Sequence, residues 1–167
     1  MLEKFVNTVT KDTKLREIQY KILNRYVATN KWLYKRKLVS SDICSFCKSD
    51  VQDIEHLFWG CEKVQILWQE LINWLYPFLI IRDLKAEDVI FGFKNKCSGN
   101  ILFNCILLVA KKFILNCKYR DVLPNVKYLQ RLIEVYHKTE LYSAFGNEKK
   151  MKMFRSKWDT CIELFEH

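Results

Sequence analysis

Four metal-ligating residues lie within one short segment of this chain, between Cys44 and Cys61. Cys44 and Cys47 form a CxxC pair, eight residues separate Cys47 from His56, and four separate His56 from Cys61. Two thiolates on a tight turn, with an imidazole and a third thiolate returned by a short loop, supply the closed tetrahedral shell that a structural zinc ion prefers. The chain must bend back on itself wherever a ligand is needed, so this segment constrains the fold strongly.

The residues between the ligands favour such bends. A polar run, Lys48-Ser49-Asp50, follows the CxxC pair and predicts a turn. Asp53 is placed to cap a short helix that carries His56, and Gly60 is expected to take a left-handed conformation just before Cys61. The alternative is that these cysteines are ordinary buried thiols, since free cysteines also occupy cores without a metal.

A catalytic zinc ion fits this pattern poorly. Catalytic sites keep one position open for water, whereas four protein ligands would fill the shell here. The zinc deaminases need a glutamate two residues after the histidine and a later CxxC, but here Phe58 follows His56 at that distance and the CxxC comes first. The sequence therefore predicts one structural Zn²⁺. Its predicted ligands are Cys44, Cys47, His56 and Cys61.

The rest of the chain has a helical pattern. Only four glycines and two prolines occur in 167 residues, and the apolar residues recur three and four positions apart. We expect an all-α fold, an irregular multi-helix bundle with one embedded CCHC zinc knuckle. The loop-like stretch Gly92–Gly99 predicts a division into residues 1–92 and residues 93–167, which either pack separately or form one domain.

The sequence also predicts where the helices lie and which of several side chains are buried. The first helix is predicted over about 12–28, with Tyr26 on its buried stripe. Further helices are predicted after Asn30 and over about 64–75, 83–91, 100–119, 125–145 and 148–165. His137 is expected at the surface and Lys157 mostly outward, whereas Cys105 and Cys117 read as core thiols.

Basic charge flanks the predicted metal segment. The net charge is +7 over residues 1–40, −5 over 41–92 and +7 over 93–167. Such flanks suit a nucleic-acid partner, although lysines on a helical protein often form only a solvated face. Basic and aromatic residues interleave around Trp32, which we expect to anchor its helix to the core. The predicted phosphate contacts are Lys14, Lys21, Arg25, Lys31, Lys35, Arg36 and Lys37. The basic first half of the last helix is a second candidate surface.

Several functional classes find no support in the sequence. There is no glycine-rich phosphate loop, HExxH or GxSxG motif, so we expect neither an enzyme nor a small-molecule substrate. The polar start MLEKFVNTVTKDTK does not resemble a signal peptide, and the apolar run Ile101–Ala110 is shorter than the roughly 20 residues of a membrane span. Seven cysteines without a secretion signal favour an intracellular protein, nuclear or cytoplasmic, with no membrane partner.

Several sequence segments occur along the chain in a recognisable order. They are TKLREIQYKILNRYVATNKWLYKR, CSFC, EHLFWGC and VAKKFILNCKY, followed by a closing helix with a Lys-Trp pair. With them, nearly the whole chain resembles the C-terminal region of reverse transcriptases from non-LTR, LINE-type retrotransposons, which carries a Cys-Cys-His-Cys zinc-binding domain. The family's ligands fall on the same four residues, and the one small departure is Glu62, where many relatives have proline.

The resemblance implies an accessory role. This region of the parent enzyme is thought to hold RNA, or RNA and target DNA together, while a separate polymerase domain extends the primed end. A zinc-stabilised, RNA-binding, non-catalytic module is therefore the leading hypothesis. The alternatives are a protein-interaction scaffold that docks onto the polymerase domain, supported by the many Trp, Tyr and Phe residues, and a remnant of a truncated element without present function.

Overall fold

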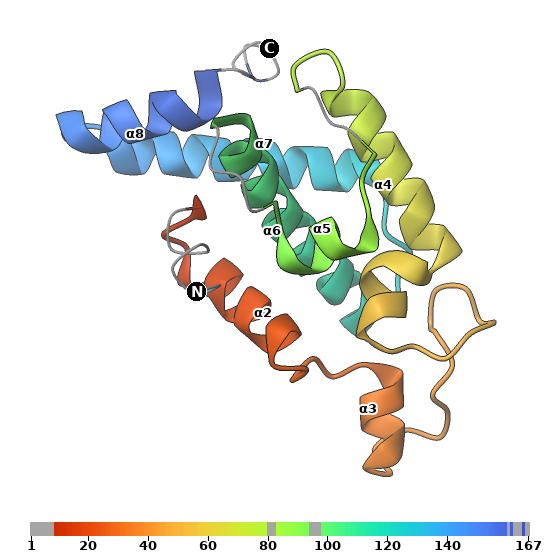
Figure 1. The fold of residues 1–167 in the computed structure, drawn as a ribbon. Helices are drawn as coiled ribbons and strands as arrows, with labels where there is room; N and C mark the ends of the chain where they lie inside the picture. The colour runs from red at the N-terminus through yellow and green to blue at the C-terminus, as the bar shows by residue number, and fades with distance from the viewer. Residues whose placement is uncertain (1–8, 80–82, 94–97, 160, 162–164, 166–167) are drawn as a thin grey trace.

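A computed structural model of the protein describes residues 9–79, 83–93, 98–159, 161 and 165, and every regular element within them is a helix. The elements are α2 (Thr13–Leu23), α3 (Asn30–Lys35), the π-helix η1 (His56–Gly60), α4 (Glu62–Leu75), α5 (Ala86–Phe91), α6 (Ser98–Tyr119), α7 (Val126–Ala144) and α8 (Glu148–Trp158) (Figure 1). The predicted all-α fold is confirmed. Ile43 and Val51 add one isolated antiparallel bridge.

Helix α6 is the core of the molecule. Helices α2, α7, α8 and η1 all pack against it, and Cys105 and Cys117 are buried within it, as expected of core thiols. Its segment Gly99–Tyr119 is long and apolar enough to cross a membrane, but 78% of the most apolar window is buried by the rest of the protein. Such burial is typical of the central helix of a globular fold.

The first helix is shorter than predicted. Helix α2 ends at Leu23 because Arg25 takes a left-handed conformation, with φ of 57°, and the N–H of Tyr26 bonds back to the carbonyl of Lys21. This ending turns Tyr26 outward, where it is 63% exposed, and Val27 takes the buried place instead. The prediction that Tyr26 is buried was therefore wrong.

Two residues of the α7–α8 pair are more buried than predicted. His137 is only 7% exposed, because its ring lies between Phe154, Trp158 and Phe165. Lys157 was expected outward but is also buried, since α8 lies along α7. Its ammonium group donates to Glu140 at 2.9 Å and to the carbonyl of Val9 at 3.1 Å. A buried lysine with a carboxylate partner ties the start of the chain to α7 and α8.

The two predicted parts of the chain contact each other. Helix α2 packs on α6, and α4 packs on α7. The centre of the predicted boundary loop, residues 94–97, lies outside the described residues, and α6 already begins at Ser98. The division at residue 92 stays a prediction.

A buried lysine connects α2, α5 and α6. Lys111 is 1% exposed, and its ammonium group donates to the Gln19 side chain at 2.5 Å and to the Val89 carbonyl at 2.9 Å. The Gln19 amide in turn donates to the carbonyl of Ile90. No carboxylate partners Lys111 in these contacts, so burial lowers the pKa of its ammonium group to about 7.

This burial predicts a specific pH dependence of stability. Between pH 7 and the ordinary lysine pKa of 10.5, the unfolded chain binds the Lys111 proton and the folded chain releases it, so the free energy of unfolding rises with pH. From pH 7 to pH 9 the gain is about 2 kcal/mol. Urea unfolding at both pH values should show this gain in the wild type and not in Lys111→Met. An equal pH dependence in the two proteins would contradict the assignment.

Candidate metal centre

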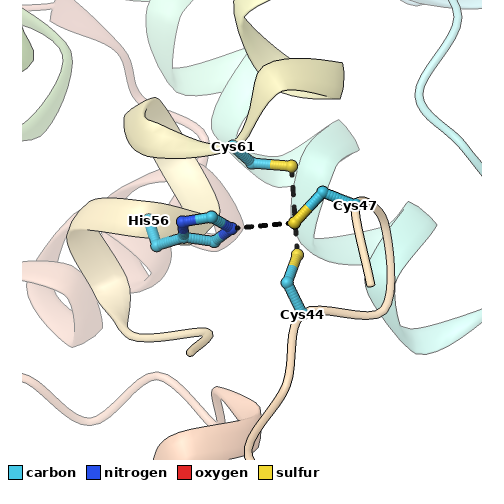
Figure 2. Close-up of side chains that lie close together, drawn as sticks. All are labelled: Cys44, Cys47, His56 and Cys61. Atoms are coloured by element: carbon cyan, nitrogen blue, oxygen red, sulfur yellow. Dashed lines mark hydrogen bonds between the residues drawn. The ribbon is translucent and has the colours of Figure 1, made fainter. Parts of the chain in front are cut away.

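The structure brings the four predicted ligands together (Figure 2). Their ligand atoms all lie within 4.8 Å of one another. The sulfur atoms of Cys44 and Cys61 are 3.9 Å apart, and the Cys47 sulfur is 3.4 Å from Nε2 of His56. A tetrahedral zinc ion with Zn–S bonds of about 2.3 Å would hold its sulfurs about 3.8 Å apart, so the donor set fits this metal in both chemistry and spacing.

A tight loop carries Cys44 and Cys47. The bridge between Ile43 and Val51 closes this loop, and the N–H of Cys44 donates to the carbonyl of Asp50 at 2.7 Å. Lys48 takes a left-handed φ of 60°, and its N–H donates to the carbonyl of Cys44 at 3.0 Å. The turn that the polar residues after the CxxC pair predicted is therefore present.

The π-helix positions the other two ligands. In an α-helix, side chains five residues apart lie about 140° apart around the axis. In η1 the N–H of Cys61 instead donates to the carbonyl of His56 at 2.9 Å, a five-residue turn that returns Cys61 toward the side of His56. The buried side chains of Leu57 and Phe58 hold this turn in the core, and the indole N–H of Trp68 donates to the Phe58 carbonyl.

The predictions for Asp53 and Gly60, which lie on either side of His56, had different outcomes. Asp53 does cap this turn, since its carboxylate accepts from the N–H of His56 at 3.0 Å. Gly60 does not take a left-handed conformation, because it lies inside the π-helix, where the chain needs no reversal. A Cβ at Gly60 would lie 3.5 Å from Nδ1 of His56, an ordinary van der Waals distance, so the site does not require glycine at this position.

The electrostatics of the site favour a thiolate at Cys44. The Cys44 and Cys61 sulfurs share a hydrogen bond, which lowers the pKa of Cys44 to about 4 and raises the pKa of Cys61. Backbone N–H groups also reach the sulfurs, from Phe46 to Cys44 and from Lys63 and Val64, at the start of α4, to Cys61. The thiolate is the form that binds a metal, so the loop and the helix N-terminus prepare the site for a cation.

Sequence reasoning missed Gln52. Its side chain is fully buried, and its amide donates to the Cys44 sulfur at 3.3 Å and to the Ser45 hydroxyl at 3.4 Å. Such contacts outside the ligand shell orient metal ligands. A single glutamine between ligands gives no periodic or motif signal, so only its position between two metal ligands could have drawn attention to it.

The predicted phosphate contacts divide into two groups. In the first group each cation has an acidic partner, with Lys21 bound to Glu17, Arg25 to Glu55 and Lys31 to Asp53. Arg25 also lies beyond the end of α2, so it does not share the helix that carries Lys14 and Lys21.

The second group is exposed and concentrated on α3. Lys35, Arg36 and Lys37 are exposed at its end, and Lys14 is exposed on α2. The guanidinium carbon of Arg36 lies 3.5 Å from the centre of the Trp32 ring. Trp32 is half-buried rather than a core anchor, and no side chain of α3 is fully buried. Nucleic-acid binding by these residues stays a prediction.

Comparison with known families gives one match. Residues 3–68 match a family model described as zinc-binding in reverse transcriptase. The matched segment contains all four candidate ligands together with α2, α3 and η1. No curated protein matches the chain. This part of the chain is thus similar to the zinc-binding region of reverse transcriptases, and its Cys₃His group supports a metal site.

The ligand geometry predicts the effect of removing one thiol. Cys47→Ser should lose bound zinc and unfold at a lower temperature, because zinc-finger peptides gain about 10 to 16 kcal/mol from their ion. Cys117→Ala is the control, since Cys117 is a buried thiol of α6 outside the ligand set. Mass spectrometry of native protein and thermal unfolding with and without chelator check both variants. Equal zinc content in the wild type and Cys47→Ser would contradict the assignment.

Proposed function

We propose that this chain is a zinc-stabilised nucleic-acid-binding module, with RNA favoured over DNA, that acts as a non-catalytic accessory part of a reverse transcriptase. The closed Cys₃His group within the segment that matches the reverse-transcriptase zinc-binding model carries this proposal. Placement at the C-terminal end of a LINE-type enzyme, and the preference for RNA, rest on the wider resemblance of the sequence.

One Zn²⁺ would be held by Cys44, Cys47, His56 and Cys61. Four protein donors leave no open position for water, so the ion would stabilise structure rather than activate a nucleophile. It would join the CxxC loop to the turn before α4. Its contribution is therefore to the shape of the surface around the site.

The exposed end of α3 is the proposed phosphate-binding surface. Residues 30–41 contain Lys31, Lys35, Arg36 and Lys37 and no aspartate or glutamate. Lys35 and Lys37 reach solvent at the end of a helix that projects from the body of the protein (Figure 1). Basic side chains beside an aromatic surface suit backbone contacts together with stacking on unpaired bases. The interaction would carry little sequence readout.

A second candidate function is supported by an exposed apolar stripe on α7. Tyr128, Val135 and Tyr142 recur every seven residues and are between 59% and 73% exposed. This periodicity is typical of a helix face that packs against another helix. The stripe would suit a scaffold role in which the module docks onto a polymerase domain, and it is compatible with RNA binding at α3.

Titration with a labelled single-stranded RNA across salt concentrations tests the proposed function. Binding should weaken linearly on a log–log plot, with each phosphate contact adding about 0.7 to the slope. The double variant Lys35→Gln, Lys37→Gln should lower both affinity and slope, because it removes two contacts.

The matched control is the double variant Lys127→Gln, Lys138→Gln, which removes two exposed charges from α7. Its net charge equals that of the Lys35→Gln, Lys37→Gln variant. This control should bind RNA as the wild type does. Absence of binding at low salt, or an equal loss in both double variants, would count against the α3 surface.

A further inference from the structure

Helix α3 is too short to be stable on its own. It has six residues, none of them fully buried, whereas isolated helices below about 12 residues are marginal in water. Figure 1 shows it at one end of the molecule, away from the helices around α6. Polar contacts at its first turn are therefore expected to contribute to its conformation.

Those contacts lead to Gln52. The first N–H groups of a helix lack partners within the helix. Here the N–H of Asn30 donates to the side-chain oxygen of Gln52 at 3.2 Å, and the N–H of Lys31 donates to its backbone carbonyl at 3.1 Å. The hydroxyl of Thr29 accepts from the next N–H, that of Trp32. Gln52 therefore caps two of the three free donors of α3.

The same glutamine contacts a metal ligand. While its oxygen accepts from α3, its NH₂ group donates to the Cys44 sulfur at 3.3 Å. A metal-bound thiolate still accepts such a hydrogen bond, so a metal that fixes the Cys44 sulfur would also hold the amide in this orientation. Both ends of the Gln52 amide are thereby engaged, one by the ligand shell and one by the helix.

A second connection runs in parallel. Asp53 accepts from the N–H of His56 with one oxygen and from the Lys31 ammonium group, at 3.1 Å, with the other. The side chain of Asn30 donates to the carbonyl of Ile43, directly before Cys44, at 2.6 Å. Asn30 and Lys31 thus bond to Gln52, Ile43 and Asp53, each of which contacts or adjoins a metal ligand.

We propose that Gln52 is a positioning residue that couples metal binding at the Cys₃His group to the placement of α3, and so to RNA affinity. The link to RNA rests on the proposed function, whereas the link from metal to α3 does not. Metal loss would free Cys44 and Gln52, leave the α3 donors uncapped and allow the helix to fray.

Amide hydrogen exchange over residues 30–38 tests this coupling, in the wild type and in Gln52→Met, each with zinc and after chelation. Methionine keeps the length of the side chain and removes the three hydrogen bonds of the amide, to Cys44, to Ser45 and from Asn30. Gln65→Met is the matched control, because the Gln65 amide also binds near the site, to the carbonyl of Trp59 at 2.6 Å, but does not contact α3. Exchange in α6 reports whether the core stays folded.

The expected result is that zinc slows exchange in α3 in the wild type and in Gln65→Met. In zinc-loaded Gln52→Met, exchange in α3 should stay fast, and RNA affinity should fall about tenfold, within the range of ordinary allosteric couplings. Zinc-loaded Gln52→Met with the protection of the wild type would overturn the proposal.

Two further readouts keep the test decisive. Asn30→Ala removes the bond to Ile43 without altering a side chain that contacts a ligand. Zinc-loaded Asn30→Ala should therefore also show faster exchange in α3. If Gln52→Met does not fold, full protection of α3 in zinc-loaded Asn30→Ala would overturn the proposal. If zinc protects α3 through Gln52 but no RNA binds, the positioning role stands and the proposed function fails.

Discussion

The convergence of three sulfur atoms and one imidazole nitrogen is the interaction on which the proposed binding surface depends. These donors come from two segments, the CxxC loop and the π turn. Thiols and an imidazole gathered within 4.8 Å are poorly stabilised without a cation, since thiolates repel one another and thiols form only weak hydrogen bonds. A zinc ion would resolve this conflict and would link the two segments through one centre.

The remainder of the fold is held together differently. Helix α6 is surrounded by helices and buries most of its length, so the hydrophobic effect stabilises this part of the molecule without any metal. The buried ammonium groups of Lys111 and Lys157 each find acceptors from another part of the chain. The molecule therefore combines an apolar core with an edge built around the candidate metal site, and α3 lies at that edge, where its first turn bonds to residues beside the ligands.

Local signals explain what the sequence could predict. Ligand spacing identified all four residues that the structure brings together, and apolar periodicity identified the all-α fold. Contacts between distant segments were beyond such reasoning. Nothing near Arg25 indicated a left-handed residue, and the surroundings of His137 are set by α8, which packs on it from another part of the chain. Gln52 was missed for the same reason, because its partners lie in two other segments.

Zinc K-edge X-ray absorption of the purified protein tests the central claim most directly, because it measures the ligand shell itself. The account predicts one zinc per chain, with three sulfur neighbours at about 2.3 Å and one nitrogen neighbour at about 2.0 to 2.1 Å. A shell dominated by oxygen and nitrogen, or protein that holds no zinc while keeping the same fold around Cys44 and His56, would contradict it.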